Sequence, residues 1–191
     1  MSQYQSSPDE VVFVGKLFNV RRQTVRHADG SESLYEIVDH PDAAAVVAIR
    51  RERATGESAE QGETLLVALV RQFRPAIGKD TLELPAGIVR TQEMGDPEVT
   101  AARELEEETG WRAGSWRLLT QQYPSAGFSN EAIWVYLATD LEKIQGAVPD
   151  PHEIQGLEWV PLREALAYCR DGRVADGKTI IGLYLASDAL A

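Results

Sequence analysis

Cysteine is almost absent from this 191-residue chain, in which Cys169 is the only one. A single cysteine excludes an intramolecular disulfide and a zinc site built on cysteine ligands. Histidine is also scarce, and His27, His40 and His152 are too scattered to form a paired ligand motif. No apolar run approaches the roughly 18 residues of a membrane-spanning helix, and the N-terminus lacks the basic and apolar regions of a signal peptide. We therefore expect a cytoplasmic protein that does not bind membranes.

Positive charge is in short supply as well, because 19 lysines and arginines stand against 30 aspartates and glutamates. The formal net charge of −11 argues against nucleic acid as a partner. Much of this charge is concentrated in one place. Residues 92–110 hold seven acidic residues and one arginine, which together supply six of the eleven excess negative charges. This acidic segment therefore needs a specific explanation.

The remaining composition is that of a folded globular protein, with 43% hydrophobic and 26% charged residues. The length fits one domain with a small additional segment, and it suffices to bury a core without disulfides. Residues 1–9 read as a disordered tail. Apolar runs bounded by turn residues predict strands at 11–14, 23–26, 34–38, 43–49, 64–70, 82–84, 116–123, 132–138 and 157–160.

Helices are fewer than strands in this pattern. Two are expected near 162–169 and 178–189, and a third contains most of the acidic segment. Asp96 is a good N-cap for that helix, Pro97 a good first residue, and Gly110 stands where a C-terminal glycine is expected. Because strands and helices do not alternate strictly, the pattern favours an α+β fold or an α/β/α sandwich around a mixed sheet.

Three carboxylates share one face of the acidic helix. At 100° per residue, with Glu104 at 0°, Glu107 falls at about 300° and Glu108 at about 40°, while Glu106 points to the opposite side. The simplest interpretation is a solvated helix face. However, like charges at this spacing repel one another, and acids near a helix C-terminus oppose its dipole. Hard Mg²⁺ or Mn²⁺ would offset this repulsion, and Arg103 can clamp Glu107 four residues further on.

This helix also resembles a known family motif. The run Arg103-Glu104-Leu105-Glu106-Glu107-Glu108-Thr109-Gly110-Trp111 matches the second half of the Nudix box, R-E-U-x-E-E-x-G-U with U apolar. In the first half, Gly87 and Glu93 have the expected five-residue gap, but nine residues instead of seven separate Glu93 from Arg103. A two-residue insertion around Met94-Gly95 accounts for the difference and puts the role of Glu93 in doubt.

The resemblance implies a fold and a reaction class. Nudix hydrolases are α/β/α sandwiches that cleave a diphosphate linked to another moiety, using Mg²⁺ or Mn²⁺. By resemblance, Glu104, Glu107 and Glu108 are the metal ligands, with Glu108 also catalytic, and the backbone carbonyl of Ala86 adds a further ligand. Arg103 would orient the glutamates. Bound metal ions would bridge the carboxylates to phosphate oxygens and activate a water.

Further segments look like the ADP-ribose pyrophosphatase branch of this family, namely residues 69–76, residues 82–87 and the β-rich segment 10–42. In that branch the N-terminal strands help to form a homodimer, and residues 43–191 would be the Nudix domain. Arg74 matches an arginine that contacts substrate phosphate, and Glu83 a glutamate near the metals and the terminal ribose. Tyr35 matches an aromatic that stacks on adenine, although an ordinary strand aromatic is an equal alternative.

Residues 123–131 resemble the Ser-Pro-Gly-Phe loop of the same branch, which implies substrate contacts for Gly127 and Ser129. The branch usually has a proline where this chain has Ala126, and that proline is a marker of ADP-ribose specificity. Other nucleoside diphosphate sugars therefore stay open as substrates. Glu131 has two open interpretations, as an acid near the substrate or as a strand cap.

The general base is expected on the loop before the last strand. Glu153 occupies one family acid position there, whereas Pro151 occupies the other and cannot serve. His152 is a weaker candidate, since a neutral imidazole can also accept a proton near pH 7.

The leading hypothesis is therefore metal-dependent hydrolysis of ADP-ribose to AMP and ribose 5-phosphate. The first alternative is an enzyme of the same fold that acts on ADP-glucose, UDP-glucose or GDP-mannose. The second is a nucleotide-sensing Nudix module without activity, which the intact box glutamates disfavour. A calcium-binding protein is a further possibility, but the chain has no EF-hand pattern.

Overall fold

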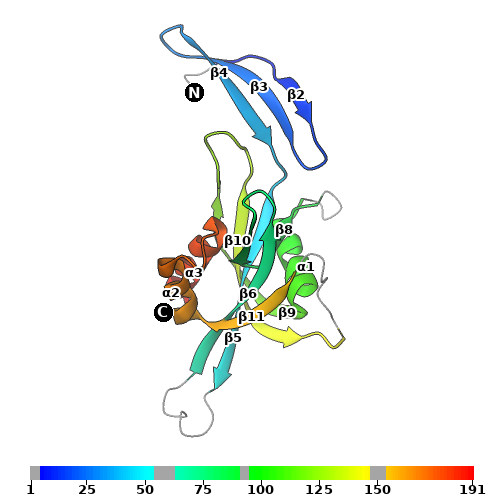
Figure 1. Ribbon diagram of the computed structural model, residues 1–191, viewed down its shortest axis with the longest axis vertical. Coiled ribbons are helices and arrows are strands. Elements are labelled where there is room, and N and C mark those ends of the chain that lie inside the picture. The colour runs from blue at the N-terminus through cyan, green and yellow to red at the C-terminus, as the bar shows by residue number, and fades with distance from the viewer. Residues whose placement is uncertain (1–4, 54–62, 91–94, 147–153) are drawn as a thin grey trace. The chain divides into compact units, whose positions relative to one another are not determined.

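The computed structural model describes residues 5–53, 63–90, 95–146 and 154–191. These residues form two compact units (Figure 1). The first contains the chain up to Asp42 together with Gln122–Ala132. The second contains Ala43–Gln121 and Ile133–Ala191. The sequence pattern gave no reason to group the segment 122–132 with the N-terminal strands.

The first unit is built on a small antiparallel sheet. Its strands are β1 (Gln5–Ser6), β2 (Glu10–Val14), β3 (Asn19–Arg26) and β4 (Glu32–Asp39). Strand β3 pairs with β4 along its whole length and with β1 and β2 on its other edge. A tight turn joins β3 and β4, which match the strands predicted at 23–26 and 34–38. In this turn Gly30 has a φ of 86° and Ser31 donates its backbone N–H to the Asp29 carboxylate.

The predicted tail is wrong for the described residues from position 5 onward. Gln5–Ser6 pairs with the end of β3, and Ser7 donates its N–H to the carbonyl of Thr24 at 2.9 Å. Asp9 accepts hydrogen bonds from Arg21 and Gln23. The sequence has no apolar alternation here, so these polar contacts could not be read from it.

The second unit contains a mixed sheet of seven described strands. They are β5 (Ala43–Arg53), β6 (Glu63–Arg74), β7 (Lys79–Glu83), β8 (Ala86–Ile88), β9 (Trp111–Gln122), β10 (Ile133–Lys143) and β11 (Gly156–Pro161). The main order is β11-β6-β5-β10-β9, with β7 beside β6 and β8 beside β5. Strands β5 and β10 are parallel, whereas β6 pairs antiparallel with β5, β7 and β11.

Helices cover both faces of this sheet. Helix α1 (Pro97–Thr109) lies on one face, while α2 (Leu162–Asp171) and α3 (Gly177–Leu190) lie on the other (Figure 1). Strand β5 is accordingly buried on both sides. Alternate residues join the core under α2 and α3, and the residues between them join the core under α1. The first set is Ala45, Val47 and Ile49, and the second is Ala44, Val46 and Ala48.

The predicted α+β sandwich is thus confirmed. The helix caps are also confirmed, because the Asp96 carboxylate accepts the N–H of Glu98 and Gly110 adopts a left-handed φ of 72°. Strands β5 and β6 extend beyond their predicted apolar runs, since backbone pairing continues through the charged residues Arg50–Arg53. Among the described helices, none combines the length and the apolar character needed to cross a membrane.

Candidate active site

The glutamates of helix α1 are buried to different extents. Ala101 and Leu105 are fully buried against the sheet. Glu104 and Glu108 are buried beside them, at 7% and 5% exposure, whereas the side chain of Glu107 is 53% exposed. Two of the three carboxylates on the predicted face are therefore held in the protein interior, where a charged group needs compensation.

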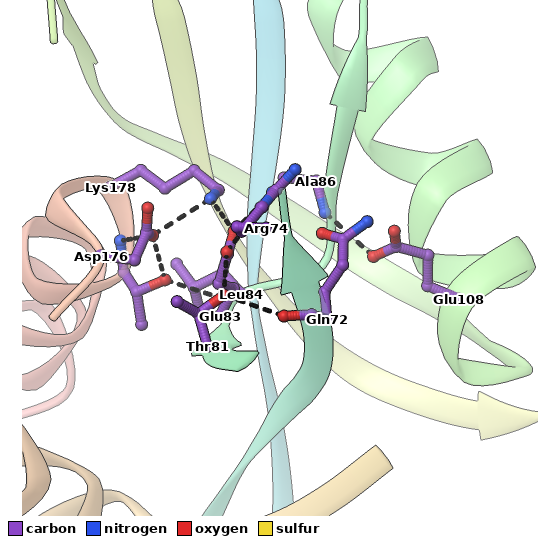
Figure 2. A network of polar contacts seen from close by, with 10 residues as sticks. Gln72, Arg74, Thr81, Glu83, Leu84, Ala86, Glu108, Asp176 and Lys178 are labelled. Atoms are coloured by element: carbon purple, nitrogen blue, oxygen red, sulfur yellow. Dashed lines mark hydrogen bonds and ion pairs between the residues drawn. The ribbon is translucent and has the colours of Figure 1, made fainter. Parts of the chain in front are cut away.

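Glu108 is held by the loop that leads into β8. Its Oε2 accepts the backbone N–H of Ala86 at 3.1 Å (Figure 2). Ala86 itself pairs with Ala45 of the central strand β5. The carboxylate is thus fixed against a rigid part of the sheet, at the residue whose carbonyl the sequence predicts as a metal ligand.

Glu104 packs directly on the glycine of the motif. A Cβ atom on Gly87 would lie 1.7 Å from Oε1 of Glu104 and 2.2 Å from its Cδ, far inside any real contact. The backbone of β8 can therefore approach this carboxylate only because residue 87 has no side chain. The spacing between glycine and glutamate in the sequence has a steric basis in the fold.

Arg103 bridges two of the glutamates. One guanidinium nitrogen, Nη1, lies 2.7 Å from Glu104 and 2.7 Å from Glu107, and Nη2 donates to the carbonyl of Ile88 at 3.4 Å. Burial raises the pKa of Glu104 above its ordinary value, although the charge and hydrogen bond of Arg103 act against this rise. Glu104 is therefore a carboxylate that one arginine compensates only in part.

The donor set of α1 suits a hard cation in its chemistry, because all of its members are carboxylates. In the described residues, however, no group of three acidic, histidine or cysteine side chains is arranged to hold a metal ion. The Arg103 guanidinium is what pairs with Glu104 and Glu107 here. Joint coordination of a cation by all three glutamates would compete with this ion pair.

A second charged cluster surrounds Glu83 at the end of β7 (Figure 2). Arg74 donates from Nε and Nη2 to the two oxygens of Glu83, at 2.7 and 2.6 Å, and Thr81 donates its hydroxyl at 2.5 Å. Burial alone would raise the pKa of this carboxyl. The hydrogen bonds from Arg74 and the charge of Lys178 outweigh burial and lower the pKa to about 2.

Lys178 reaches Glu83 from the opposite element, helix α3. Its Nζ donates to Oε2 of Glu83 and, at 3.1 Å, to the carboxylate of Asp176. The neighbouring Thr179 accepts the N–H of Leu84 through its hydroxyl at 2.9 Å. Helix α3 is thus fastened to the strand end that leads into the Ala86–Gly87 loop.

The two clusters are close enough to interact electrostatically. The hydrogen bond and charge of Glu83 raise the pKa of Arg74, and the charges of Asp176 and Glu108 add to this rise. Figure 2 shows Lys178 on the α3 side and Glu108 on the α1 side, with the β7–β8 region between them. Arg74, Glu83, Ala86 and Glu108 therefore lie in one region of the structure.

The remaining described candidates lie in the first unit. Tyr35, on β4, is 42% exposed. Gly127 and Ser129 lie in the loop 123–131, which is bound to the end of β4: Val38 donates to the carbonyl of Phe128 at 2.7 Å, and Asn130 donates to that of Val38.

Polar side chains extend this attachment of the loop. Asn130 accepts the N–H of His40 and donates to Asp39. Glu131 lies 3.4 Å from Nδ1 of His40. Glu93, His152 and Glu153 lie outside the described residues.

Nothing in the sequence motifs pointed to Lys178, which is 95 positions from its partner Glu83. One signal was nevertheless present. Lys178 is in the first turn of α3, where the helix dipole disfavours a positive charge, and it follows the N-cap Asp176 by two residues. A lysine there opposes the helix dipole, and the carboxylates of Asp176 and Glu83 offset this cost.

Comparison with known proteins gives consistent matches. A family model described as the NUDIX domain matches residues 39–180. A methanol dehydrogenase activator from Bacillus methanolicus is 36% identical over 175 residues, covering 91% of this chain and 87% of that protein. An ADP-ribose pyrophosphatase from Mycobacterium tuberculosis is 32% identical over 184 residues, covering 94% and 81%. A crystal structure of an ADP compounds hydrolase has a TM-score of 0.79 at 18% identity, over 100% of this chain and 95% of that one, which bears on the fold alone.

Proposed function

The chain belongs to the Nudix family, and from this premise we propose that it hydrolyses the diphosphate of ADP-ribose to AMP and ribose 5-phosphate. The observation that carries the proposal is the contact between the box glycine and the box glutamates. Glu104 packs on Gly87, and Glu108 accepts the N–H of Ala86. This arrangement places two buried carboxylates beside one backbone loop, where a diphosphate can be held only with help from positive charge.

Divalent metal ions are part of the proposal. Glu104, Glu107, Glu108 and the carbonyl of Ala86 would hold Mg²⁺ or Mn²⁺, which would supply charge neutralisation and an activated water. The partly compensated charge of Glu104 supports this assignment, because burial without a full counter-charge favours binding of a cation. Arg103 would then orient Glu107 and release Glu104 as the ion binds.

The other predicted residues have separate roles in this proposal. Arg74 would bind a substrate phosphate, and Glu83 would lie near the metals and the terminal ribose. Tyr35 would stack on the base, with Gly127 and Ser129 as further substrate contacts. Glu153 is the proposed general base. The ADP-ribose pyrophosphatase named above, which aligns over 94% of this chain, supports ADP-ribose as the first substrate to test.

The experiment is a panel of substrates with the purified protein. ADP-ribose, ADP-glucose, UDP-glucose, GDP-mannose and a dinucleoside polyphosphate are incubated with Mg²⁺ or Mn²⁺, and monophosphate release is followed. We expect the highest kcat/KM for ADP-ribose. Equal or faster turnover of another nucleoside diphosphate sugar would move the substrate assignment to that compound. This alternative is open because Ala126 stands where the ADP-ribose branch usually has a proline.

Two variants test the metal assignment within the same assay. Glu108→Gln and Glu107→Gln should each lower kcat by roughly 100-fold or more while the protein stays folded. Glu106→Gln is the matched control, because Glu106 is on the same helix but pairs with Arg112 instead. If Glu107→Gln and Glu108→Gln turn over substrate at the rate of the control, the proposed ligands are wrong.

We also propose that the protein is a homodimer that associates through the first unit. Its sheet and the following turn expose large apolar side chains, including Val11, Phe13, Val14 and Leu34, at 52–76% exposure. These exposed apolar side chains support the proposal, because a contiguous apolar surface is typical of a protein–protein interface. Light scattering should give twice the chain mass, and Val14→Glu should shift the mass toward the monomer.

A further inference from the structure

We propose that Lys178 is a positioning residue that allows Arg74 to exchange Glu83 for a substrate phosphate. The inference rests on the proposed function, since it requires a phosphate-bearing substrate at Arg74. It concerns a lysine outside the Nudix box, on the last helix of the chain.

The two cationic side chains around Glu83, Arg74 and Lys178, differ in their exposure to solvent. Glu83 is 2% exposed and the side chain of Lys178 is 9% exposed, so this pair is enclosed by protein. The side chain of Arg74 is 41% exposed. Arg74 is therefore the member of the cluster that an incoming ligand can reach, whereas Lys178 is the member that stays with Glu83.

The Arg74 guanidinium is oriented by its bond to Glu83. Two of its nitrogens, Nε and Nη2, face the carboxylate in a parallel pair of hydrogen bonds. The third nitrogen, Nη1, has no hydrogen-bond partner among the described residues. An arginine engaged in this way presents its outer edge as a planar fork, which suits phosphate oxygens.

A phosphate bound at this outer edge would compete with Glu83 for the charge of Arg74 and so weaken the bond between Arg74 and Glu83. Leaving a buried carboxylate without a counter-charge is strongly unfavourable, because no interaction then compensates for its lost hydration. Lys178 removes this obstacle, since its ammonium group already contacts Glu83 and is itself held by Asp176. Glu83 therefore stays paired while Arg74 turns to the ligand.

The position of Lys178 supports this role over a purely structural one. Lys178 stands in the first turn of α3, where a positive charge opposes the helix dipole. The helix already has an N-cap in Asp176, whose carboxylate accepts from the backbone and hydroxyl of Thr179. The lysine is thus not required for capping, and its ammonium group joins Asp176 to Glu83.

The test is a double-mutant cycle with ADP-ribose as substrate. Lys178→Met should raise KM by about tenfold or more with a change in kcat of less than about threefold, because Arg74 would stay bound to Glu83. Lys178→Arg should restore most of the affinity. Arg74→Met should raise KM on its own, and adding Lys178→Met to it should have little further effect on KM, since the two residues act in one step.

Two controls separate the possible failures. Lys143→Met removes an exposed lysine at the end of β10 and should leave KM unchanged. Thermal melts of all variants show whether each one is folded. If the wild-type protein hydrolyses no nucleoside diphosphate derivative, the proposed function fails. If the wild type is active but the KM effects of Lys178→Met and Arg74→Met multiply in the double variant, or Lys178→Met leaves KM unchanged, the role of Lys178 is overturned.

Discussion

The backbone of Gly87 lies so close to the Glu104 carboxylate that a methyl side chain at position 87 would overlap it. A Cβ atom at position 87 would stand 1.7 Å from the carboxylate oxygen Oε1 of Glu104. The glycine is in a strand that pairs with β5, so the backbone has little freedom to retreat. The absence of a side chain at this one position therefore allows the carboxylate to lie where it does.

The Gly87→Ala variant should therefore lose activity. Moving Glu104 by an ångström or more disturbs any site that depends on its position, and turnover should fall by roughly 100-fold. Gly156→Ala is the control, because a Cβ atom there meets no atom of the described residues within 4 Å. Wild-type turnover in Gly87→Ala, measured with the best substrate of the panel, would show that Glu104 does not need this position.

The Glu83 cluster should make stability depend on pH. The folded-state pKa of about 2 is below the ordinary value of 4.5, so the ionised carboxyl stabilises the fold above pH 4.5. This contribution is lost as pH falls from 4.5 toward 2. Glu83→Gln should lower the free energy of unfolding by about 2 kcal/mol at pH 7, and by progressively less below pH 4.5.

Urea unfolding between pH 3 and pH 7 measures this dependence. Glu36→Gln is a suitable control, because Glu36 forms an ion pair with Arg22 in which its own side chain is 64% exposed. Such an exposed pair should contribute less than about 1 kcal/mol. A Glu83→Gln profile parallel to that of the wild type would contradict the predicted linkage.

The hydroxyl group of Thr179 should contribute to the stability of the fold. Its oxygen accepts the N–H of Leu84, and both groups are buried. Thr179→Val keeps the shape but leaves that N–H without a partner, which should cost about 1–3 kcal/mol in urea unfolding. Thr179→Ser retains the oxygen and should lose much less; equal losses in the two variants would place the effect in packing instead.

Close packing of α3 on the sheet gives a further prediction. A Cβ atom on Gly182 would lie 2.6 Å from Leu84 and 3.1 Å from Val135. Gly182→Ala should therefore destabilise the protein by about 1–3 kcal/mol. Gly177→Ala, in the first turn of the same helix with open space at Cβ, should change stability by less than about 1 kcal/mol. Differential scanning calorimetry of the two variants makes the comparison, and equal melting temperatures would refute it.

The sequence was sufficient to predict features that depend on local chemistry. Asp96, Pro97 and Gly110 bound the acidic helix because capping and glycine conformations are local properties. Apolar runs identified β5, β6 and β10 because these strands are buried in the sheet, whereas the short strand β8 (Ala86–Ile88) was not predicted. The spacing of Glu104 and Glu108 likewise followed from helix geometry alone.

Features that depend on contacts between distant residues could not be predicted in this way. Lys178 meets Glu83 only after α3 has packed on the sheet. Arg50 lies 4.7 Å from the ring centre of Trp159 and 5.5 Å from that of Trp111, although the sequence shows only three separate residues. The unequal burial of Glu107 and Glu108 also depends on how α1 is rotated against the sheet, which the acidic pattern does not specify.

The loop 122–132 belongs to the first unit, where it is hydrogen-bonded to the N-terminal segment, but both of its ends continue into strands of the second unit. Together with the link after Asp42, this makes three places where the backbone passes from one unit to the other. The N-terminal strands are therefore not a detachable module. Deleting residues 1–42 would strip the loop of Val38, Asp39 and His40, its hydrogen-bonding partners. A chimaera with a relative would have to exchange both segments together.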